Sequence, residues 1–271
     1  MSQFPPFQTS VAMNELETDE LHFPVIVQPK RDGVRIAMTT ENGTTVAITR
    51  GGKRLVVSGV QMPANVVLDA ELFAPWDQLT SILAGSLTIA DSDACVYVFD
   101  AVTTEQWHTR AGDTPYAQRL ENAARCVAEL GSAFVKVFES SLVHNAKQLH
   151  EHYAQALANG FEGVVVKDPR AAYAFAKVGI TKIKPRHTWK CTVRDWAAGS
   201  DCRSFGAWVV ELNGVETRVG TGYSNAMRDE FLTSNPSTYV GRVVEVQGQE
   251  LTAHGKIRFP SFVRFRDDVA A

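Results

Sequence analysis

A change of pattern near residues 186–190 divides this sequence into two stretches that do not share one architecture. Before it, dense apolar runs rich in β-branched residues alternate with helical periodicities, as in a mixed α and β fold. After it, short strand-like runs dominate, with one helical piece at 225–232 among them. Five or so short strands over about eighty residues are typical of a small barrel. The pattern therefore predicts two domains, 1–188 and 189–271.

Bulk composition narrows the class of protein. The chain has 271 residues, of which 45% are hydrophobic and 21% charged, as in ordinary globular proteins. No apolar run approaches the length of a membrane span, and the first residues lack a secretory signal pattern. Four scattered cysteines without a Cys-x-x-Cys pair argue against a disulfide framework and a zinc ribbon. These features predict a cytoplasmic protein with no membrane partner. They are compatible with a viral or a bacterial origin.

The first stretch contains its own turn and helix signals. Asn42-Gly43, flanked by alternating apolar runs, predicts a hairpin. Asn145 is a candidate N-cap for the last of the expected helices. Helical periodicity predicts helices over 76–87, 116–130 and 145–160. Dense apolar runs predict buried strands at 65–74, 93–102 and 161–169.

The sequence VQPKRDGVRIAM, residues 27–38, crowds charges around Gly33 between two apolar segments. Further along, an acid ends one apolar run, an aromatic residue lies in the next, and two lysines alternate on one face of a strand. Each of these features is ordinary by itself. Together they form an ordered series: K-x-D-G-x-R at 30–35, Glu71, Phe99, E-G-x-x-x-K at 162–167 and K-x-K at 182–184.

This ordered series resembles the covalent nucleotidyltransferases: ATP-dependent DNA ligases, RNA ligases and mRNA capping enzymes. Residues 218–232 and 241–268 look like the OB-fold domain of small ATP-dependent DNA ligases, with its terminal arginine motif. The resemblance implies an α+β chain, with an ATP-grasp-like nucleotidyltransferase (adenylation) domain over 1–188 and a β-barrel OB-fold domain over 189–271. It also implies an enzyme that seals 5′-phosphate/3′-hydroxyl nicks in duplex DNA, in repair or replication, through lysyl-AMP and adenylylated DNA.

The resemblance carries roles to individual residues. Lys30 is the catalytic nucleophile that receives AMP. Glu71 and Glu162 are the expected metal ligands, for Mg²⁺ or Mn²⁺. The residues expected to bind ATP are Gln28 at the adenine edge, Phe99 stacked on adenine, Arg35, Arg50 and Glu71 at ribose and phosphate, Lys167, Lys182 and Lys184 at the α-phosphate and leaving group, and Arg266 in the terminal motif. The expected partner is nicked duplex DNA, bound by a monomer.

The chemistry explains why these residue types belong together. A protonated lysine is a poor nucleophile, and burial with nearby cations lowers its pKa and frees the amine. Arg31 and Arg35 flank Lys30 in sequence, and the three later lysines are expected to converge on it. The same positive field stabilises the charge on a phosphate under attack. A glycine at position 33 lets the backbone approach the nucleotide closely.

Two positions depart from the family pattern. Ala70 replaces the glycine of the usual Asp-Gly-Glu, and Val269 replaces the lysine that usually ends the terminal motif. An RNA ligase or a capping enzyme would share the first reaction step, and preferential labelling by GTP would indicate a capping enzyme. A non-catalytic OB-fold binding module is the alternative from another class, and it accounts only for the second stretch.

Overall fold

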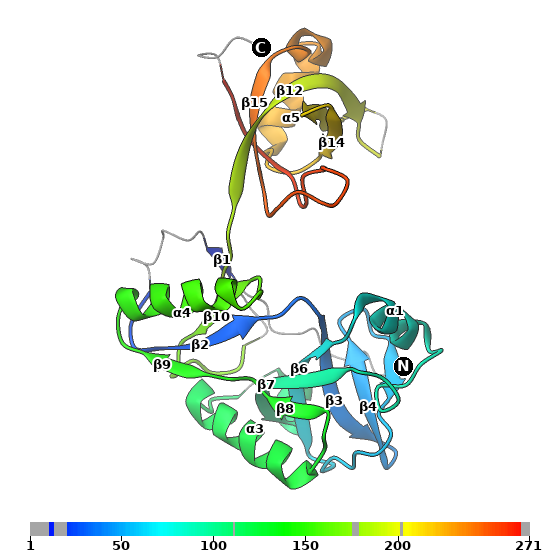
Figure 1. The fold of residues 1–271 in the computed structure, drawn as a ribbon, viewed down its shortest axis with the longest axis vertical. Coiled ribbons are helices and arrows are strands. Elements are labelled where there is room, and N and C mark those ends of the chain that lie inside the picture. Colours follow the sequence, from blue (N-terminus) through cyan, green and yellow to red (C-terminus); the bar gives the residue numbers. More distant parts are fainter. Residues whose placement is uncertain (1–10, 14–20, 111, 175–178, 201–202, 267–271) are drawn as a thin grey trace. The chain divides into compact units, whose positions relative to one another are not determined.

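The computed structural model describes residues 11–13, 21–110, 112–174, 179–200 and 203–266. Internal contacts divide the chain into two units, Met1–Lys184 and Pro185–Ala271, which we describe separately (Figure 1). The division predicted at residue 188 falls inside β12 (His187–Ala198), the first strand of the second unit. Because that strand opens with polar residues, its start carries no apolar signal in the sequence.

One sheet of the first unit carries Lys30. The helix α4 (Ala146–Ala158) packs on its central strands β2 and β10, and Leu149 and Tyr153 join their core. All neighbouring strands are antiparallel except β1 and β11. The strand order is β1 (Val11–Met13), β11 (Ile180–Ile183), β10 (Gly163–Lys167), β2 (Val25–Lys30) and β9 (Ser141–Val143).

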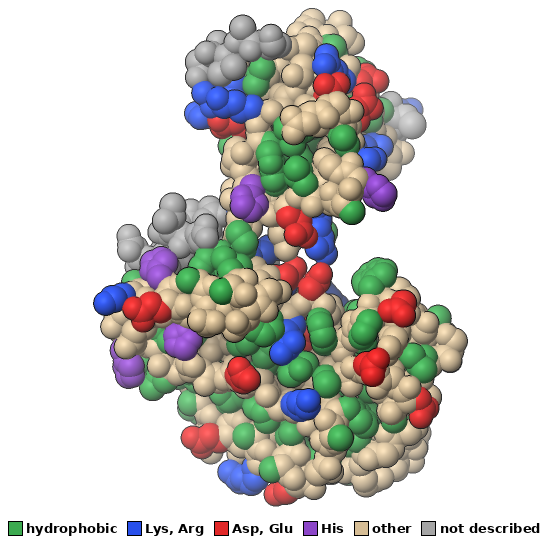
Figure 2. Space-filling view, in the orientation of Figure 1, with side chains coloured by type: hydrophobic (Ala, Val, Ile, Leu, Met, Phe, Trp, Pro, Cys, Tyr) green, Lys and Arg blue, Asp and Glu red, His purple; other side chains and the backbone are tan. Residues whose placement is uncertain are grey.

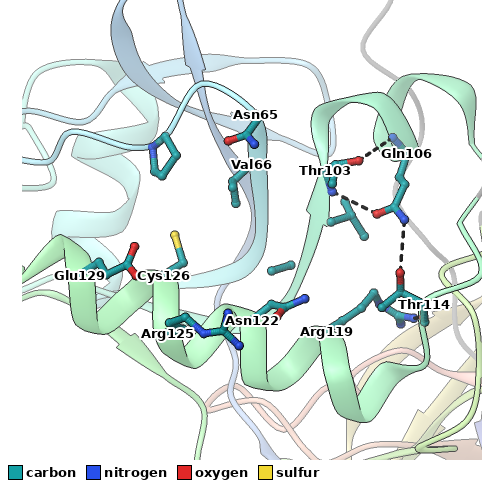
Figure 3. A pocket seen from close by; sticks show the side chains of 13 residues that line it. Asn65, Val66, Thr103, Gln106, Thr114, Arg119, Asn122, Arg125, Cys126 and Glu129 are labelled. Atoms are coloured by element: carbon teal, nitrogen blue, oxygen red, sulfur yellow. Dashed lines mark hydrogen bonds between the residues drawn. The ribbon is translucent and has the colours of Figure 1, made fainter.

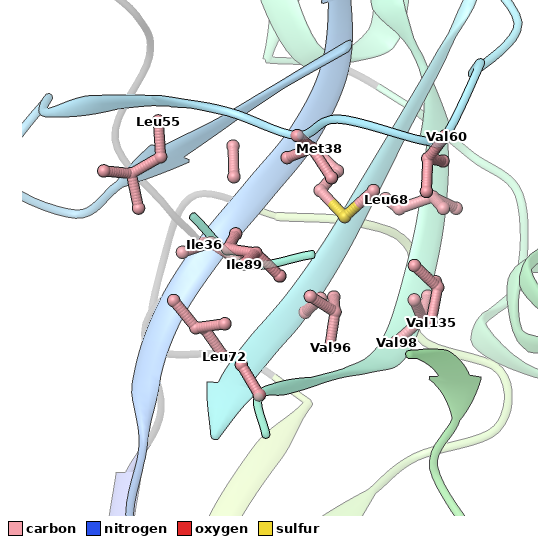
Figure 4. Packing of buried hydrophobic residues seen from close by; sticks show 14 of the residues in the cluster. Ile36, Met38, Leu55, Val60, Leu68, Leu72, Ile89, Val96, Val98 and Val135 are labelled. Atoms are coloured by element: carbon pink, nitrogen blue, oxygen red, sulfur yellow. The ribbon is translucent and has the colours of Figure 1, made fainter. Parts of the chain in front are cut away.

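A second sheet of the first unit holds the largest core. Helices α1 (Trp76–Ala84) and α3 (Tyr116–Leu130) contribute apolar side chains to the cluster shown in Figure 4. Ile36, Met38 and Leu68 are fully buried there, as the alternation along their strands predicts. The order is β5 (Arg54–Val56), β4 (Thr44–Thr49), β3 (Val34–Glu41), β6 (Val66–Phe73), β7 (Cys95–Thr103) and β8 (Val135–Val137).

Local sequence signals in the first unit correctly predicted a turn and a helix cap but missed one helix. Asn42 and Gly43 both have positive φ, at 49° and 77°, so the predicted turn between β3 and β4 is confirmed. The Asn145 side chain accepts a hydrogen bond from the Gln148 amide, which confirms the predicted cap of α4. The sequence reading missed α2 (Thr104–Thr109), although Thr103 and Gln106 form a capping box at its start.

The second unit is a five-stranded antiparallel sheet around an aromatic core. Trp208, Phe205 and Phe231 form its centre, with ring centroids 4.5 to 5.3 Å apart. Within the described residues, β14 and β16 are the two edges, so the predicted closed barrel is not formed by strand pairing. The order is β14 (Val215–Val219), β13 (Phe205–Leu212), β12, β15 (Val243–Gly248) and β16 (Ser261–Phe265), with α5 (Asn225–Thr233) and the 3-10 helix η2 (Pro236–Tyr239) between β14 and β15.

No helix in the described part of the chain is both long enough and apolar enough to cross a membrane. Charges of both signs are interspersed with hydrophobic side chains on the visible face of the first unit (Figure 2). This mixture agrees with the small net charge of −3.

Candidate functional site

Lys30 is the last residue of β2, at the point where the chain leaves one sheet of the first unit for the other. Its amine forms an ion pair with the Glu162 carboxylate, and its backbone carbonyl accepts a hydrogen bond from the Glu162 amide at 3.0 Å. The Lys30 side chain is 18% exposed. The amine is thus held at a fixed place yet remains reachable from solvent.

The Lys30 amine has the electrostatic surroundings of a nucleophile. Burial lowers its pKa from 10.5 to about 8, and Lys182 and Lys184 lower it further, against Glu71 and Asp32. The expected contribution of cations is therefore present, but Lys182 and Lys184 supply it. At pH 8 about half of the Lys30 side chains would carry a free amine.

Gly163 explains how Lys184 comes near the Lys30 amine. It lies directly opposite Lys30 in the pairing of β2 with β10. A Cβ atom at Gly163, which has φ 145°, would lie 2.2 Å from the Ile183 carbonyl oxygen and 3.0 Å from the Lys184 Cα. The predicted strand with alternating lysines ends at Ile183, so only Lys182 lies within β11 and Lys184 follows it. Burial and the Arg35 charge lower the pKa of Lys182.

Glu71 reaches the same place from the other sheet. It lies opposite Arg35 in the pairing of β3 with β6. Burial raises its pKa to about 7, although the charges of Lys30 and Arg35 oppose the shift. A Cβ at Gly33 would lie 2.5 Å from the Leu72 carbonyl oxygen and 2.9 Å from the Glu71 Cγ. The glycine therefore permits close packing against Glu71, a role that differs from the expected approach to a nucleotide.

Arg35 is held by a residue that sequence reasoning did not select. Its guanidinium makes two hydrogen bonds to Asp69, at 2.8 and 2.5 Å, and Asp69 also accepts one from the Tyr173 hydroxyl at 2.8 Å. Asp69 and Tyr173 are almost completely buried. Asp69 precedes Glu71 by two residues on β6, so strand alternation could have identified it as a neighbour on the same face.

Phe99 and Lys167 form the other end of the site. The Lys167 amine donates to the Phe99 carbonyl at 3.2 Å and to the Tyr116 hydroxyl at 3.1 Å, and it lies 4.4 Å from the centre of the Phe99 ring. Lys167 is 3% exposed, and burial lowers its pKa to about 7. It stands at the opposite end of β10 from Glu162. The structure therefore groups Lys167 with the aromatic residue and apart from Lys30.

Gln28 is buried on β2, with 2% of its surface exposed. Its side-chain amide donates to the Ser140 hydroxyl at 2.9 Å, and that hydroxyl donates to the Phe138 carbonyl at 3.0 Å. Phe138 also lies near the Phe99 ring, with centroids 6.2 Å apart. Gln28 and Phe99 are therefore linked through two residues, Ser140 and Phe138.

Two predicted residues stand apart. Arg50 follows β4 with an exposed side chain, and it acts on the site through its charge near Lys182. Arg266 belongs to the second unit, where its guanidinium bonds to the Glu245 carboxylate. Arg264 donates to the same carboxylate at 2.8 Å. Val269 lies outside the described residues.

The two expected metal ligands do not form a metal centre by themselves. No group of three or more His, Cys, Asp or Glu side chains suited to an ion occurs among the described residues. A separate cavity of about 360 Å³ lies between α3 and the start of β6 (Figure 3). None of the predicted site residues lines it.

Comparison with known proteins identifies the family. Residues 8–184 match the family model of the ATP dependent DNA ligase domain, and residues 203–266 match that of the DNA ligase OB-like domain. The chain belongs to the ATP-dependent DNA ligase family. The ligase match covers the whole group of Lys30, Glu71, Glu162 and Lys182, and the OB-like match ends at Arg266.

Individual relatives of this ligase-family chain agree. It is 25% identical over 252 residues to the DNA ligase of Haemophilus influenzae, covering 88% of this chain and 85% of the relative. It is 25% identical over 185 residues to the DNA ligase of Methanococcoides burtonii, covering 58% of this chain and 32% of the relative. The chain therefore spans about a third of the length of that archaeal relative.

A solved structure shares the fold of this ligase-family chain. A DNA ligase of the Lig E type superposes with a TM-score of 0.72 at 21% identity, covering 97% of this chain and 99% of the other. The likeness supports the α+β architecture with a nucleotidyltransferase domain and an OB-like domain.

Proposed function

We propose that this protein is an ATP-dependent DNA ligase that seals nicks in duplex DNA as a monomer. The observation that carries the proposal is the Lys30 amine, which has its pKa lowered to about 8 beside Glu162 in a chain of the ligase family. Since ATP and DNA are its proposed substrates, we place its action in the cytoplasm. We assign adenylation to residues 1–188. We assign closure around the DNA and the nucleotide to residues 189–271.

In the first step, the deprotonated Lys30 amine attacks the α-phosphorus of ATP. An N–P bond forms, the bond to the β-phosphate oxygen breaks, and pyrophosphate leaves with that electron pair. Lys182 and Lys184 offset the charge that grows on the phosphate oxygens. The amine loses its proton to solvent, so the rate rises with pH through about 8.

In the later steps, AMP passes from Lys30 to the 5′-phosphate at a nick. The adjoining 3′-hydroxyl then attacks that phosphate, forms the phosphodiester bond and releases AMP. Both transfers exchange one phosphorus bond for another and need no second ATP.

The rest of the site positions the nucleotide. Phe99 stacks on adenine and Gln28 reads its edge, while Arg35, Arg50 and Glu71 face ribose and phosphate. Lys167 supports the Phe99 end, because its amine already bonds to the Phe99 carbonyl. The contact of Lys167 with the α-phosphate that the resemblance implies stays a prediction.

Mg²⁺ or Mn²⁺ fits this donor set. Magnesium is commonly bound by one or two carboxylates together with substrate phosphates, and the Glu71 and Glu162 carboxylates both act on the Lys30 amine. The ion would neutralise phosphate charge. Glu162 forms an ion pair with the Lys30 amine.

The second unit is proposed to be an OB-fold barrel that closes at its two edge strands. The Phe262 amide donates to the Thr221 carbonyl at 2.9 Å, which joins the segment that follows β14 to β16 by one backbone bond. A Cβ at Gly222 would lie 2.3 Å from the Phe262 carbonyl oxygen, so glycine permits this approach. We propose that Arg266 leaves Glu245 and orients the pyrophosphate during the first step.

Incubation with ATP labelled at the α-phosphate, Mg²⁺ and nicked duplex DNA tests the proposal. The expected results are a denaturation-resistant adduct mapped to Lys30 and a sealed strand. An adduct on another lysine, or stronger labelling by GTP, contradicts the assignment.

A second assay separates the steps. Arg266→Ala should lose self-adenylylation yet still seal a nick that already carries AMP. Equal losses in both assays would contradict the role of Arg266.

A further inference from the structure

Arg31, beside the nucleophile, lies in surroundings unusual for a charged side chain. Its guanidinium carbon lies 4.0 Å from the centre of the Tyr97 ring, 4.8 Å from that of Phe161 and 5.3 Å from that of Phe73. Its Nε is buried and has no hydrogen-bond partner among the described residues. No carboxylate in the described part of the chain forms an ion pair with Arg31.

The rings of Phe73, Tyr97 and Phe161, which we call the aromatic cage, have a chemistry that suits arginine. A guanidinium is planar and weakly hydrated, so it stacks on aromatic faces more readily than an ammonium does. Burying an N–H group without a hydrogen bond is nevertheless unfavourable, and an apolar side chain of similar length would avoid that cost. The retention of a charge here calls for a reason beyond filling space.

The position of the cage supplies that reason. Residues 31–33 carry the chain from β2 in one sheet to β3 in the other. Phe161 directly precedes β10 of the first sheet, whereas Phe73 and Tyr97 belong to β6 and β7 of the second. Arg31 therefore contacts both sheets at the crossing where the nucleophile lies.

The aromatic residues of the cage are neighbours of the acids that face Lys30. Phe161 precedes Glu162, so the pair 30–31 meets the pair 161–162: Lys30 bonds to Glu162 and Arg31 stacks on Phe161. Tyr97 lies directly opposite Glu71 in the pairing of β6 with β7. A shift of Arg31 would therefore be transmitted to Lys30 and to both carboxylates.

We propose that Arg31 is a positioning residue: stacked among Phe73, Tyr97 and Phe161, it ties the two sheets together at the crossing and holds Lys30 beside Glu162. This role rests on the proposed function, in which Lys30 is the nucleophile. Alignment within a fraction of an ångström matters for such a step, since a displacement of about 1 Å can cost on the order of a hundredfold in rate.

The first test reads the position of Lys30 without ATP. Trace acetic anhydride labels the amine of the full chain from pH 6 to 11, and mass spectrometry of the Lys30 peptide gives its titration midpoint. The native midpoint is expected near 8. Arg31→Met keeps an unbranched chain as far as the position of Nε but removes the rest of the guanidinium with its charge and stacking, and the released Lys30 amine should titrate about one pH unit higher or more, toward the ordinary value.

Arg31→Met also removes a positive charge next to Lys30, so Tyr97→Leu, which keeps that charge, decides whether a shift in midpoint reports displacement of the amine from the groups that act on it. They are Glu162, Glu71, Asp32, Lys182 and Lys184. Arg54→Met is the matched control, because Arg54 lies on β5 and pairs with Glu41 at the surface. An Arg31→Met midpoint equal to that of the control overturns the proposal.

The second test measures single-turnover self-adenylylation. Arg31→Met should lower the rate at saturating ATP by about ten- to a hundredfold, while the half-saturating ATP concentration changes less than about threefold, as expected when alignment fails and not binding. An unchanged rate, or a loss confined to the half-saturating concentration, overturns the proposal. Arg31→Lys should recover part of the rate because an ammonium also binds aromatic faces. A lysine variant as slow as the methionine variant would overturn the role of the charge.

Tyr97→Leu covers the case in which Arg31→Met does not fold. It removes the nearest ring and keeps Arg31, and it should raise the Lys30 midpoint in the same direction. An unaltered midpoint in a folded Tyr97→Leu protein overturns the proposal. If native protein takes no label from ATP, the proposed function fails, and the Lys30 midpoint still decides the role of Arg31.

Discussion

A lysine with a lowered pKa lies at each end of the paired strands β2 and β10, and the two lysines differ in their exposure and in their partners. Lys30 pairs across from Gly163 at one end, and Lys167 pairs across from Ile26 at the other. Burial is the largest cause of a lowered pKa at both, to about 8 at Lys30 and about 7 at Lys167. The Lys30 amine meets a carboxylate and remains 18% exposed, whereas the Lys167 amine donates to a carbonyl and a hydroxyl and is sealed from solvent.

The difference teaches that a lowered pKa does not by itself identify a nucleophile. Both amines lose their proton well below the ordinary lysine pKa of 10.5, but of the two only the Lys30 side chain is open to solvent. Its surrounding charges, Lys182 and Lys184, can also act on an incoming phosphate. The Lys167 amine instead donates hydrogen bonds to the Phe99 carbonyl and the Tyr116 hydroxyl, inside the protein.

Removal of the nucleophile should have the largest effect. Lys30→Ala is expected to abolish covalent labelling by ATP, because no other amine in the site occupies its place. Gel detection and peptide mapping measure the label, and circular dichroism checks that the fold is kept. Persistent label at native levels would break the distinction between the two lysines.

Gly163→Ala should damage the Lys30 end next most strongly. The new Cβ would lie 2.2 Å from the Ile183 carbonyl oxygen, at a φ of 145° that side chains rarely adopt. We expect a loss of roughly 3 to 4 kcal/mol in the free energy of unfolding, measured by urea denaturation.

Gly43→Ala is the matched control for that loss. Gly43 also has positive φ, at 77°, but nothing lies within 4 Å of its added Cβ. It should cost only about 1 kcal/mol. Equal losses would show that backbone conformation alone, and not the approach of Ile183, decides the effect.

The lowered pKa of Lys167 should make the free energy of unfolding depend on pH. Between pH 7 and 10.5 the unfolded chain binds a proton at Lys167 that the folded chain does not. The free energy of unfolding therefore rises with pH in this window, by up to about 1.4 kcal/mol per unit, and the contribution is lost as pH falls to 7. Lys167→Met should remove about 2 kcal/mol of the rise between pH 7 and 9.

Lys190→Met, at an exposed position of β12, is the control for the slope. It should keep the native rise in the free energy of unfolding. A Lys167→Met protein with the same rise as this control would contradict the burial of a neutral amine.

The smallest effect is expected from Tyr116→Phe. The hydroxyl donates to the Phe99 carbonyl at 2.8 Å and accepts from Lys167 at 3.1 Å, so its removal should cost about 1 to 2 kcal/mol of unfolding free energy. Thermal denaturation measures the loss. A variant as stable as the native protein would show that the Lys167 amine finds its partners without the ring hydroxyl.

Sequence reasoning predicted the elements with strong local signals. The helix at Tyr116–Leu130 and the Asn42-Gly43 turn were predicted with the bounds that the structure shows, because periodicity and turn chemistry act over a few residues. The start of β12 carries no such signal, because its first residues are polar. The closed barrel stays a prediction, since strand pairing among the described residues leaves β14 and β16 at the edges.

By itself, the sequence determined the family and the order of its motifs, since residue types and their succession are properties of the chain alone. Only the tertiary structure decided which of these residues meet. It placed Lys182 and Lys184 near the Lys30 amine, sent Lys167 to the Phe99 end, and made Asp69 the partner of Arg35. The physical reason is that pKa values and ion pairs depend on burial and on distances between strands that are far apart in sequence, and these distances exist only once the sheets have formed.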